Sequence, residues 1–202
     1  MDHLKAIPVR RVVTGHDGAG KAIIASDGQP PVVFEVSIRG TWFTELWRTQ
    51  AAPAFVDNGP DPTEGARQLR PPRNGTTIRI VQIAPEKDSP VPNDPALMKA
   101  MFSGLGSPHA STTTQSSLHP LMHRTETIDY GIVLEGEVTL ILDDSETTLQ
   151  AGDIVVQRGT NHAWSNRGDK PCRIVFILVD GKYSDEVSHV LDLRHRESGD
   201  EH

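Results

Sequence analysis

The sequence predicts an all-β protein whose short strands form a sandwich or a barrel. The 202 residues include 17 Gly and 15 Pro, and only 36% are hydrophobic, a composition typical of loop-rich β proteins rather than helical bundles. Short runs of apolar and β-branched residues recur along the chain, and turn-forming residues separate them. A chain of this length is expected to bury one well-packed core.

The first part of the chain is predicted to contain five strands, at residues 11–14, 21–25, 32–38, 43–48 and 76–83. In the last of these, polar and apolar residues alternate, which indicates a strand that is buried on one face. Residues 50–76 are rich in Pro, Gly, Asn and Asp and are expected to form a long surface excursion. A short helix is predicted at residues 95–102, with Asp94 as its N-cap and Pro95 at its first position.

The strand signal is densest beyond residue 121. Further strands are predicted at residues 132–134, 138–142, 154–156 and 174–179, with a hairpin turn at residues 143–146. Many short strands with closely spaced turns favour a sandwich or barrel over other all-β folds.

Composition also excludes several classes of partner. The formal net charge is -7 and no cluster of Lys and Arg stands out, so nucleic acid is not an expected partner. No apolar run approaches the roughly 18 residues that span a membrane. The first residues contain no signal-peptide core, so we expect a soluble cytoplasmic protein. The single cysteine, Cys172, lies in an apolar run and is expected to be a buried structural thiol.

One motif is rejected. Residues 15–21 fit most of the phosphate-binding loop pattern, but Ala22 stands where that loop needs Ser or Thr. The segment that follows reads as a strand, whereas a phosphate loop requires a helix. A turn at Asp17 and Gly18 between two strands is the better interpretation.

A candidate metal site follows from side-chain alternation. If residues 123–129 form one strand, His123, Thr125 and Asp129 share a face, because side chains alternate along a strand. By the same argument His162 and Trp164 share a face. Two histidines and a carboxylate on facing strands could converge on one metal ion, and Trp164 would then form a pocket wall.

These residues resemble the motifs of the cupin superfamily, over about residues 121–179. The first cupin motif has two histidines one residue apart, then a glutamate and a glycine. Gly136 matches that glycine, Asp129 takes the place of the glutamate, and Thr125 and His123 take the places of the histidines. The second motif is matched by residues Gly152, Gly159, His162 and Asn166.

The resemblance implies a cupin-type double-sheet β-barrel, jelly-roll-like, with an N-terminal strand extension and little helix. Residues 1–115 would extend the barrel sheets, 116–182 would form the barrel core, and 183–202 would form a C-terminal segment and flexible tail. Cupins commonly dimerise through such strand extensions, so a homodimer is expected.

The resemblance also implies a divalent metal ion, Fe, Zn, Mn or Ni, held by His123, Asp129 and His162. Two histidines and one carboxylate suffice for non-haem iron and leave positions open for substrate or oxygen. His119 is a second-ranked fourth ligand, because Pro120 interrupts the alternation between it and His123. The competing interpretation is a barrel that has lost its metal, with His123 hydrogen-bonded in the core and Asp129 capping a strand or paired with Arg158.

The predicted function is a metal-dependent cupin enzyme that acts on a small oxygenated organic molecule. The metal would act as a Lewis acid in lyase, isomerase or dioxygenase chemistry. Thr125 and Trp164 would line the substrate pocket, and Tyr130 or Arg158 would supply a proton or a charge. The alternative is a non-catalytic barrel that binds or senses a small ligand.

Overall fold

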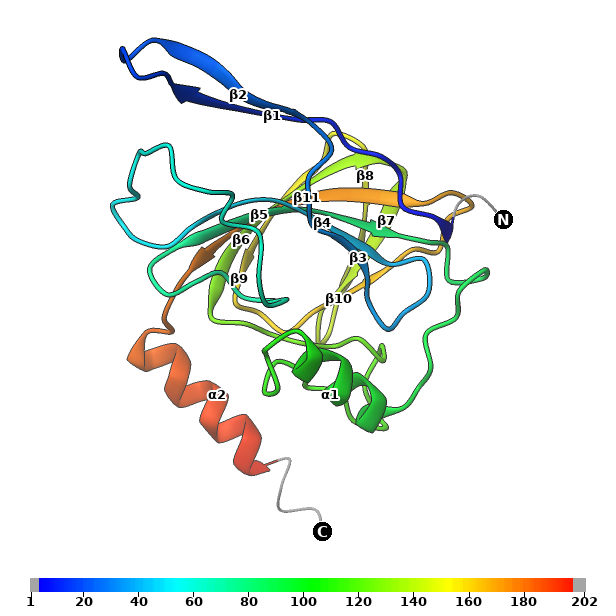
Figure 1. Ribbon diagram of the computed structural model, residues 1–202. Coiled ribbons are helices and arrows are strands. Elements are labelled where there is room, and N and C mark those ends of the chain that lie inside the picture. Colours follow the sequence, from blue (N-terminus) through cyan, green and yellow to red (C-terminus); the bar gives the residue numbers. More distant parts are fainter. Residues whose placement is uncertain (1–3, 198–202) are drawn as a thin grey trace.

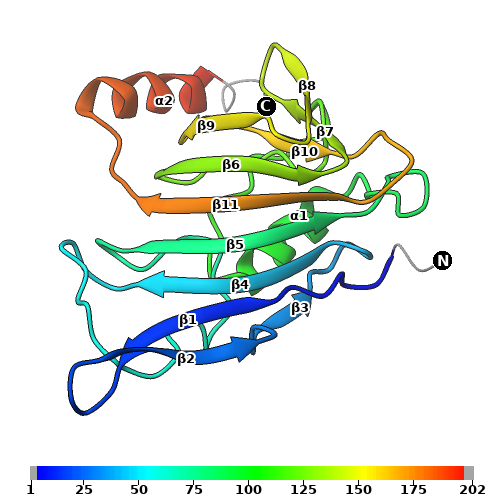
Figure 2. The ribbon, with the colours of Figure 1, turned by 90° about the horizontal axis from the view of Figure 1, so that it is seen from above.

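The computed structural model describes residues 4–197, with side chains as far as residue 191. It is a predominantly β structure with three antiparallel sheets: a larger and a smaller sheet that face each other, and a separate two-stranded hairpin (Figures 1 and 2). The larger sheet has six strands, in the order β3 (Val33–Glu35), β4 (Trp42–Thr49), β5 (Thr76–Ile83), β11 (Cys172–Asp180), β6 (Thr127–Glu135) and β9 (Ile154–Arg158). The smaller sheet has three, in the order β10 (Ala163–Ser165), β7 (Glu137–Ile141) and β8 (Glu146–Gln150). The all-β, double-sheet prediction is confirmed.

The core lies between the two sheets. Along β11 the side chains alternate between buried and half-buried, with Cys172, Ile174, Phe176 and Leu178 turned inward. They pack in one cluster with Val138 of the smaller sheet. Cys172 is a buried free thiol, and burial raises its pKa to about 12, so it is an unreactive core residue as predicted.

Strands from the N-terminal part complete the larger sheet. β4 pairs with β5, and β5 pairs with β11, so strands before residue 84 supply half of the sheet that faces the core. A separate hairpin, β1 (Arg11–His16) and β2 (Ala22–Gly28), stands off from this body (Figure 1). Its turn is fastened by the Asp17 carboxylate, which accepts hydrogen bonds from the backbone N–H groups of Ala19 and Lys21. The turn interpretation of residues 15–21 is therefore confirmed.

Helix α1 (Pro95–Gly104) covers one end of the space between the sheets. It begins as predicted, because the Asp94 carboxylate accepts hydrogen bonds from the N–H groups of Ala96 and Leu97, and Pro95 occupies the first turn. Its Met98 and Phe102 side chains are buried in the core. Phe102 also lines the candidate site, so the helix contributes to both the core and the pocket.

A second helix, α2 (Asp185–Glu197), follows β11 and was not predicted. Val187, Val190 and Leu191 have helical spacing, but charged residues dominate the segment, which is why it was expected to be irregular. The end of the predicted flexible tail, residues 198–202, lies outside the described residues. Within residues 4–197, no helix is both long and apolar enough to cross a membrane.

Candidate functional site

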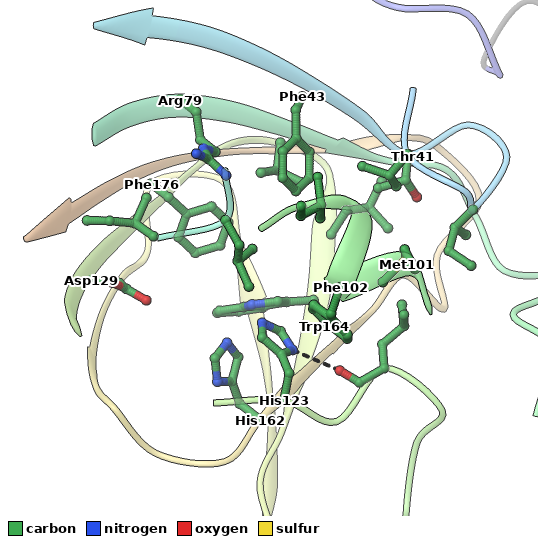
Figure 3. Close-up of a pocket in the computed structure, with 18 residues that line it drawn as sticks. Thr41, Phe43, Arg79, Met101, Phe102, His123, Asp129, His162, Trp164 and Phe176 are labelled. Atoms are coloured by element: carbon green, nitrogen blue, oxygen red, sulfur yellow. Dashed lines mark hydrogen bonds between the residues drawn. The ribbon is translucent and has the colours of Figure 1, made fainter. Parts of the chain in front are cut away.

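A pocket opens between the two sheets beneath helix α1 (Figure 3). Its empty volume is about 810 Å³, including the open mouth. Most of its wall is aliphatic or aromatic, with Phe43, Phe102, Trp164 and Phe176 among the lining residues. The ionisable side chains in the wall are few: Arg79, His123, Asp129 and His162. An apolar pocket with a few polar groups is typical of a small-molecule site.

The two histidines meet through an isolated antiparallel bridge between residues 123 and 162. Each backbone N–H donates to the other residue's carbonyl at 2.9 Å. The imidazole rings lie with their centroids 4.2 Å apart. Residues thirty-nine positions apart in the chain are thus held side by side by main-chain hydrogen bonds, which do not depend on the side chains themselves.

Hydrogen bonding also sets the orientation of both rings. Nδ1 of His123 donates to the carbonyl of Leu121 at 2.8 Å, and Nδ1 of His162 donates to the carbonyl of Thr160 at 2.9 Å. A carbonyl can only accept, so the proton of each neutral ring sits on Nδ1 and the lone pair on Nε2. Histidines that bind metals are oriented in this way by their second nitrogen.

Both imidazoles are neutral at physiological pH. Burial lowers the pKa of His123 to about 4. Burial and the neighbouring His123 lower the pKa of His162 well below its ordinary value. Desolvation disfavours the charged form of a histidine, so each ring offers a lone pair rather than a positive charge.

Aromatic side chains hold the pair in place. The ring centroids of Phe102, on α1, and His123 are 4.8 Å apart. Trp164 of β10 meets the His162 ring edge-on, with a centroid distance of 5.7 Å. Trp164 in turn packs against Phe176, with ring centroids 5.3 Å apart. Trp164 is one of the residues that line the pocket. Aromatic side chains from α1, β10 and β11 thus form the part of the wall around the buried His162 and the half-buried His123.

Asp129 lines the same pocket on a different part of its wall (Figure 3). Within the described residues no group of three or more His, Cys, Asp or Glu side chains is arranged to hold a metal ion. The expected set of His123, Asp129 and His162 is therefore not assembled. The reason is local: β6 begins only at Thr127, whose N–H donates to the carbonyl of Thr125, so residues 123–129 are not one strand with simple alternation.

The other predicted site residues lie outside this pocket. Thr125 is buried, and its hydroxyl hydrogen-bonds that of Thr127 at 2.7 Å. Tyr130 is 41% exposed, because it follows Asp129 on the strand and points to the opposite face. Arg158 is exposed and is paired in register with Ile128, so it too faces away from Asp129. None of these three contributes to the pocket wall.

His119 is also engaged elsewhere. Its Nε2 lies 3.0 Å from a carboxylate oxygen of Glu86, and its Nδ1 accepts a hydrogen bond from the N–H of Leu121. Both ring nitrogens are thus used, and His119 has no lone pair left for a metal. Its place in the structure is to brace the segment that carries His123.

Sequence reasoning missed the charged part of the wall. Arg79 of β5 is 2% exposed and Glu45 of β4 is fully buried, and an ion pair of 3.2 Å joins them. Arg48 lies 3.4 Å from the same carboxylate. Alternation in residues 76–83 suggested that the arginine faces solvent, whereas it faces the pocket. The available signal was the presence of opposite charges in two neighbouring strands.

Comparison with known proteins places the chain in a family. A family model described as "Cupin domain" matches residues 112–178. The chain is 30% identical over 179 residues to the "Phomopsin biosynthesis cluster protein C'" of Diaporthe leptostromiformis, covering 85% of this chain and 78% of that protein. The chain belongs to the cupin superfamily.

Other similar proteins carry the family in their names. This cupin is 28% identical over 183 residues to the "Cupin-domain-containing oxidoreductase virC" of Hypocrea virens, covering 85% and 76% of the two chains. It is 31% identical over 144 residues to the "Cupin-domain-containing oxidoreductase srdD" of Neurospora crassa, covering 68% and 57%. The family model spans His123, Asp129 and His162, whereas Arg79 and Glu45 lie outside it.

Proposed function

We propose that this cupin is an enzyme, of oxidoreductase type, that transforms a small oxygenated organic molecule beside His123 and His162. The observation that carries the proposal is a pair of neutral imidazoles that line an apolar pocket, His162 buried and His123 half-buried, with hydrogen bonds that leave the lone pair of each ring on Nε2. The oxidoreductase names of the relatives virC and srdD support the same class of activity.

The proposed cofactor is one divalent metal ion, iron, zinc, manganese or nickel. Imidazole nitrogens suit these metals, and His123 and His162 would hold the ion through Nε2. The bound metal would supply Lewis-acid polarisation of a substrate oxygen. Two protein ligands leave the remaining positions to water or substrate, so the site would bind metal less tightly than a three-ligand site.

The residues around the histidines have their own tasks in this proposal. The carbonyls of Leu121 and Thr160 keep both rings in one tautomer. Phe102 packs on the His123 ring and Trp164 on the His162 ring, and both contacts reduce the access of water to the imidazoles. Exclusion of water strengthens every polar interaction that a substrate makes in the pocket.

A turnover screen tests the proposal. Protein loaded with each of the four metals would be incubated with a panel of small alcohols, phenols, aldehydes and ketones, and products would be detected by mass spectrometry. We expect conversion of at least one compound, and His162→Ala should abolish it while leaving the fold intact by circular dichroism. Tyr130→Phe, on the opposite face of β6, is the control that should keep activity. Conversion that survives His162→Ala would contradict the assignment.

The alternative function is a non-catalytic ligand-binding barrel. It is favoured by the largely apolar pocket wall and by the separation of Asp129 from the two histidines. Under this alternative a compound from the same panel would bind and be recovered unchanged with every metal. That result would replace the enzyme proposal with the binding proposal.

The expected homodimer also stands as a proposal. The hairpin β1–β2 exposes Val12, Ile23 and Ile24, the last of them at 65%. A two-stranded hairpin is only marginally stable by itself in water. A second copy of this chain that covers the hairpin would stabilise it and bury these side chains.

A further inference from the structure

The pocket wall formed by the larger sheet carries an array of charged groups. In the strand register Arg79 of β5 lies between Glu45 and Phe176, and Asp129 of β6 lies opposite Leu178. Phe176 and Leu178 are two positions apart on β11, so these side chains all point to the same face of the sheet. Figure 3 shows the Arg79 guanidinium and the Asp129 carboxylate on the same side of the pocket.

Arg79 is held firmly but not completely satisfied. Its Nη2 donates to the carbonyl of Gln68 at 2.7 Å and lies 3.2 Å from the Glu45 carboxylate. Its guanidinium is stacked over the Phe43 ring at 5.0 Å. Its Nε–H, however, is buried and has no hydrogen-bond partner. The side chain therefore keeps one fixed, unused donor.

Asp129 has a buried hydrogen-bond acceptor without a partner, which complements the unused donor of Arg79. The carboxylate is 6% exposed, and its Oδ1 is buried without a hydrogen-bond partner. Arg79 and Asp129 influence each other electrostatically, yet no ion pair joins them within the described residues. Leaving a buried polar atom without a partner is unfavourable, so an unused donor and an unused acceptor on one pocket wall indicate a missing ligand group.

We propose that Arg79 and Asp129 bind a hydroxyl group of the substrate. Arg79 donates a hydrogen bond to the hydroxyl oxygen, and the Asp129 carboxylate accepts a hydrogen bond from the hydroxyl O–H. This inference rests on the proposed function, since it names the substrate class for the same pocket. A hydroxyl group satisfies both atoms at once, because it accepts and donates. The remainder of the wall is aliphatic and aromatic, so the body of the substrate is apolar.

Charge distinguishes a hydroxyl from a carboxylate. The two guanidinium groups of Arg48 and Arg79 are balanced by the carboxylates of Glu45 and Asp129. A ligand carboxylate would add a further negative charge to this buried group and would place an oxygen acceptor against the Asp129 acceptor. A neutral hydroxyl leaves the balance intact, and burying an unpaired charge is far more costly than burying a hydrogen-bonded hydroxyl.

The position of the hydroxyl also orients the rest of the molecule. Phe176 lies next to Arg79 in the sheet and packs on Trp164. Trp164 in turn packs on His162. A flat apolar body anchored at Arg79 and Asp129 would lie along this aromatic wall, with its other end directed to the histidines. The substrate class is thus a small, neutral, hydroxylated molecule with an aromatic or alkyl body.

Three probes of similar shape test the inference: p-cresol, p-xylene and p-toluate, which place a hydroxyl, a methyl and a carboxylate on one ring position. Binding would be measured by ligand-observed NMR and calorimetry at about pH 8, where the phenol is neutral and the benzoate ionised. The proteins are the full chain, Asp129→Ala, and Tyr130→Phe as the neighbouring control on the opposite face. Arg79→Lys is a second variant, because lysine keeps the charge beside Glu45 and lacks Nε–H.

We expect p-cresol to bind the unmodified protein about tenfold more tightly than p-xylene, since a site that hydrogen-bonds a hydroxyl rejects the analogue lacking it. Asp129→Ala and Arg79→Lys should each reduce this preference to about threefold or less. Tyr130→Phe should retain it. Should Asp129→Ala not fold, Arg79→Lys alone decides.

Three results would overturn the inference: equal binding of p-cresol and p-xylene, tighter binding of p-toluate, or no binding of any probe. The proposed enzyme function is tested separately, by turnover and by the His162 variant. Loss of the hydroxyl preference with turnover retained would refute only the substrate assignment. Retained preference without turnover of any compound would refute only the enzyme proposal.

Discussion

The two polar regions of the pocket are built on opposite principles. His123 and His162 are neutral, and each has its Nδ1 satisfied by a backbone carbonyl. Arg79 and Asp129 belong to a charged array with Glu45 and Arg48, and each retains a buried polar atom without a partner. The first region offers lone pairs to a metal or a proton, and the second offers hydrogen bonds to a fixed part of a ligand.

Under the two proposals above, the histidine region would carry the reaction and the charged region would recognise the substrate within one apolar cavity. Main-chain hydrogen bonds position the histidines, so these residues tolerate changes elsewhere in the wall. Ion pairs position Arg79, so its place depends on one buried carboxylate. The charged region should therefore be the more sensitive to substitution for stability, and the histidine region for activity.

The largest effect on stability is expected for Glu45→Gln. The change leaves two buried guanidinium groups without their shared carboxylate and should lower the free energy of unfolding by about 3–5 kcal/mol. Chemical denaturation measures it. Glu135→Gln is the control. The Glu135 carboxylate is exposed, so its ion pair with Arg173 should contribute at most about 1 kcal/mol to the free energy of unfolding. Equal effects of both changes would show that the Glu45 array is not a structural centre.

A loss of activity with little loss of stability is expected for His162→Ala. Under the proposed function the variant should lose at least about 10²-fold in turnover, the scale of removing a group that takes part in the reaction. The removed ring is replaced by space in an apolar wall, so the fold should persist. Turnover would be followed on the compound found in the screen. A variant that unfolds, or one that keeps full turnover, would remove the distinction between the two regions.

A pH-dependent effect is expected for Asp129→Asn. Burial raises the pKa of Asp129 from 3.8 to about 6, and the hydroxyl of Thr127 and the charge of Arg79 offset this only in part. The pKa of Asp129 is higher in the folded protein than in the unfolded chain. Its contribution to the free energy of unfolding is therefore greatest below pH 3.8 and is lost as the pH rises through about 6. Asp129→Asn should remove this loss, and at pH 8 it should be more stable than the unmodified protein by about 1–3 kcal/mol.

The control for that change is the same comparison at low pH. Below about pH 3 the carboxyl of Asp129 is protonated in both the folded and the unfolded protein, and the two proteins should have equal stability. Thermal unfolding at a series of pH values would measure this. A stability difference that is constant with pH would mean that packing, rather than ionisation of Asp129, accounts for the effect.

The smallest effect is expected far from either region. Ile24→Asp on the β1–β2 hairpin should shift a dimer towards monomer in sedimentation experiments at low protein concentration, without changing p-cresol binding. Charged residues on an exposed edge oppose pairing with another chain. A protein that is monomeric before the change would contradict the proposed homodimer and leave the pocket comparison untouched.

Much of the fold was predictable because local patterns and tertiary structure agree. The strand at Thr76–Ile83 and the start of α1 at Asp94 and Pro95 follow the sequence signals closely. His123 and His162 were singled out because the turn glycines around them are distinctive. The helix α2 was missed because charged residues dominate its sequence, so the few apolar residues at helical spacing, Val187, Val190 and Leu191, were not recognised as a helix face.

The site was less predictable because strand alternation was extended beyond the strand. Asp129 was grouped with His123 on the assumption of one continuous strand, and the turn at Thr125 and Thr127 breaks it. Arg79 was missed because an arginine within an alternating strand is normally on the solvent face. Its burial depends on Glu45, thirty-four positions earlier, and single-strand patterns do not contain that information.

The most direct test is to measure bound metal by plasma mass spectrometry after the protein has been loaded with iron, zinc, manganese or nickel. Four proteins would be compared: the unmodified chain, His123→Ala, His162→Ala and Asp129→Asn. We predict bound metal in the unmodified chain, its loss in both histidine variants and its retention in Asp129→Asn. Loss of metal in Asp129→Asn to the same extent as in the histidine variants would contradict the separation of the two polar regions. Absence of metal uptake by the unmodified chain would contradict the metal-binding role of the histidines and favour the ligand-binding barrel.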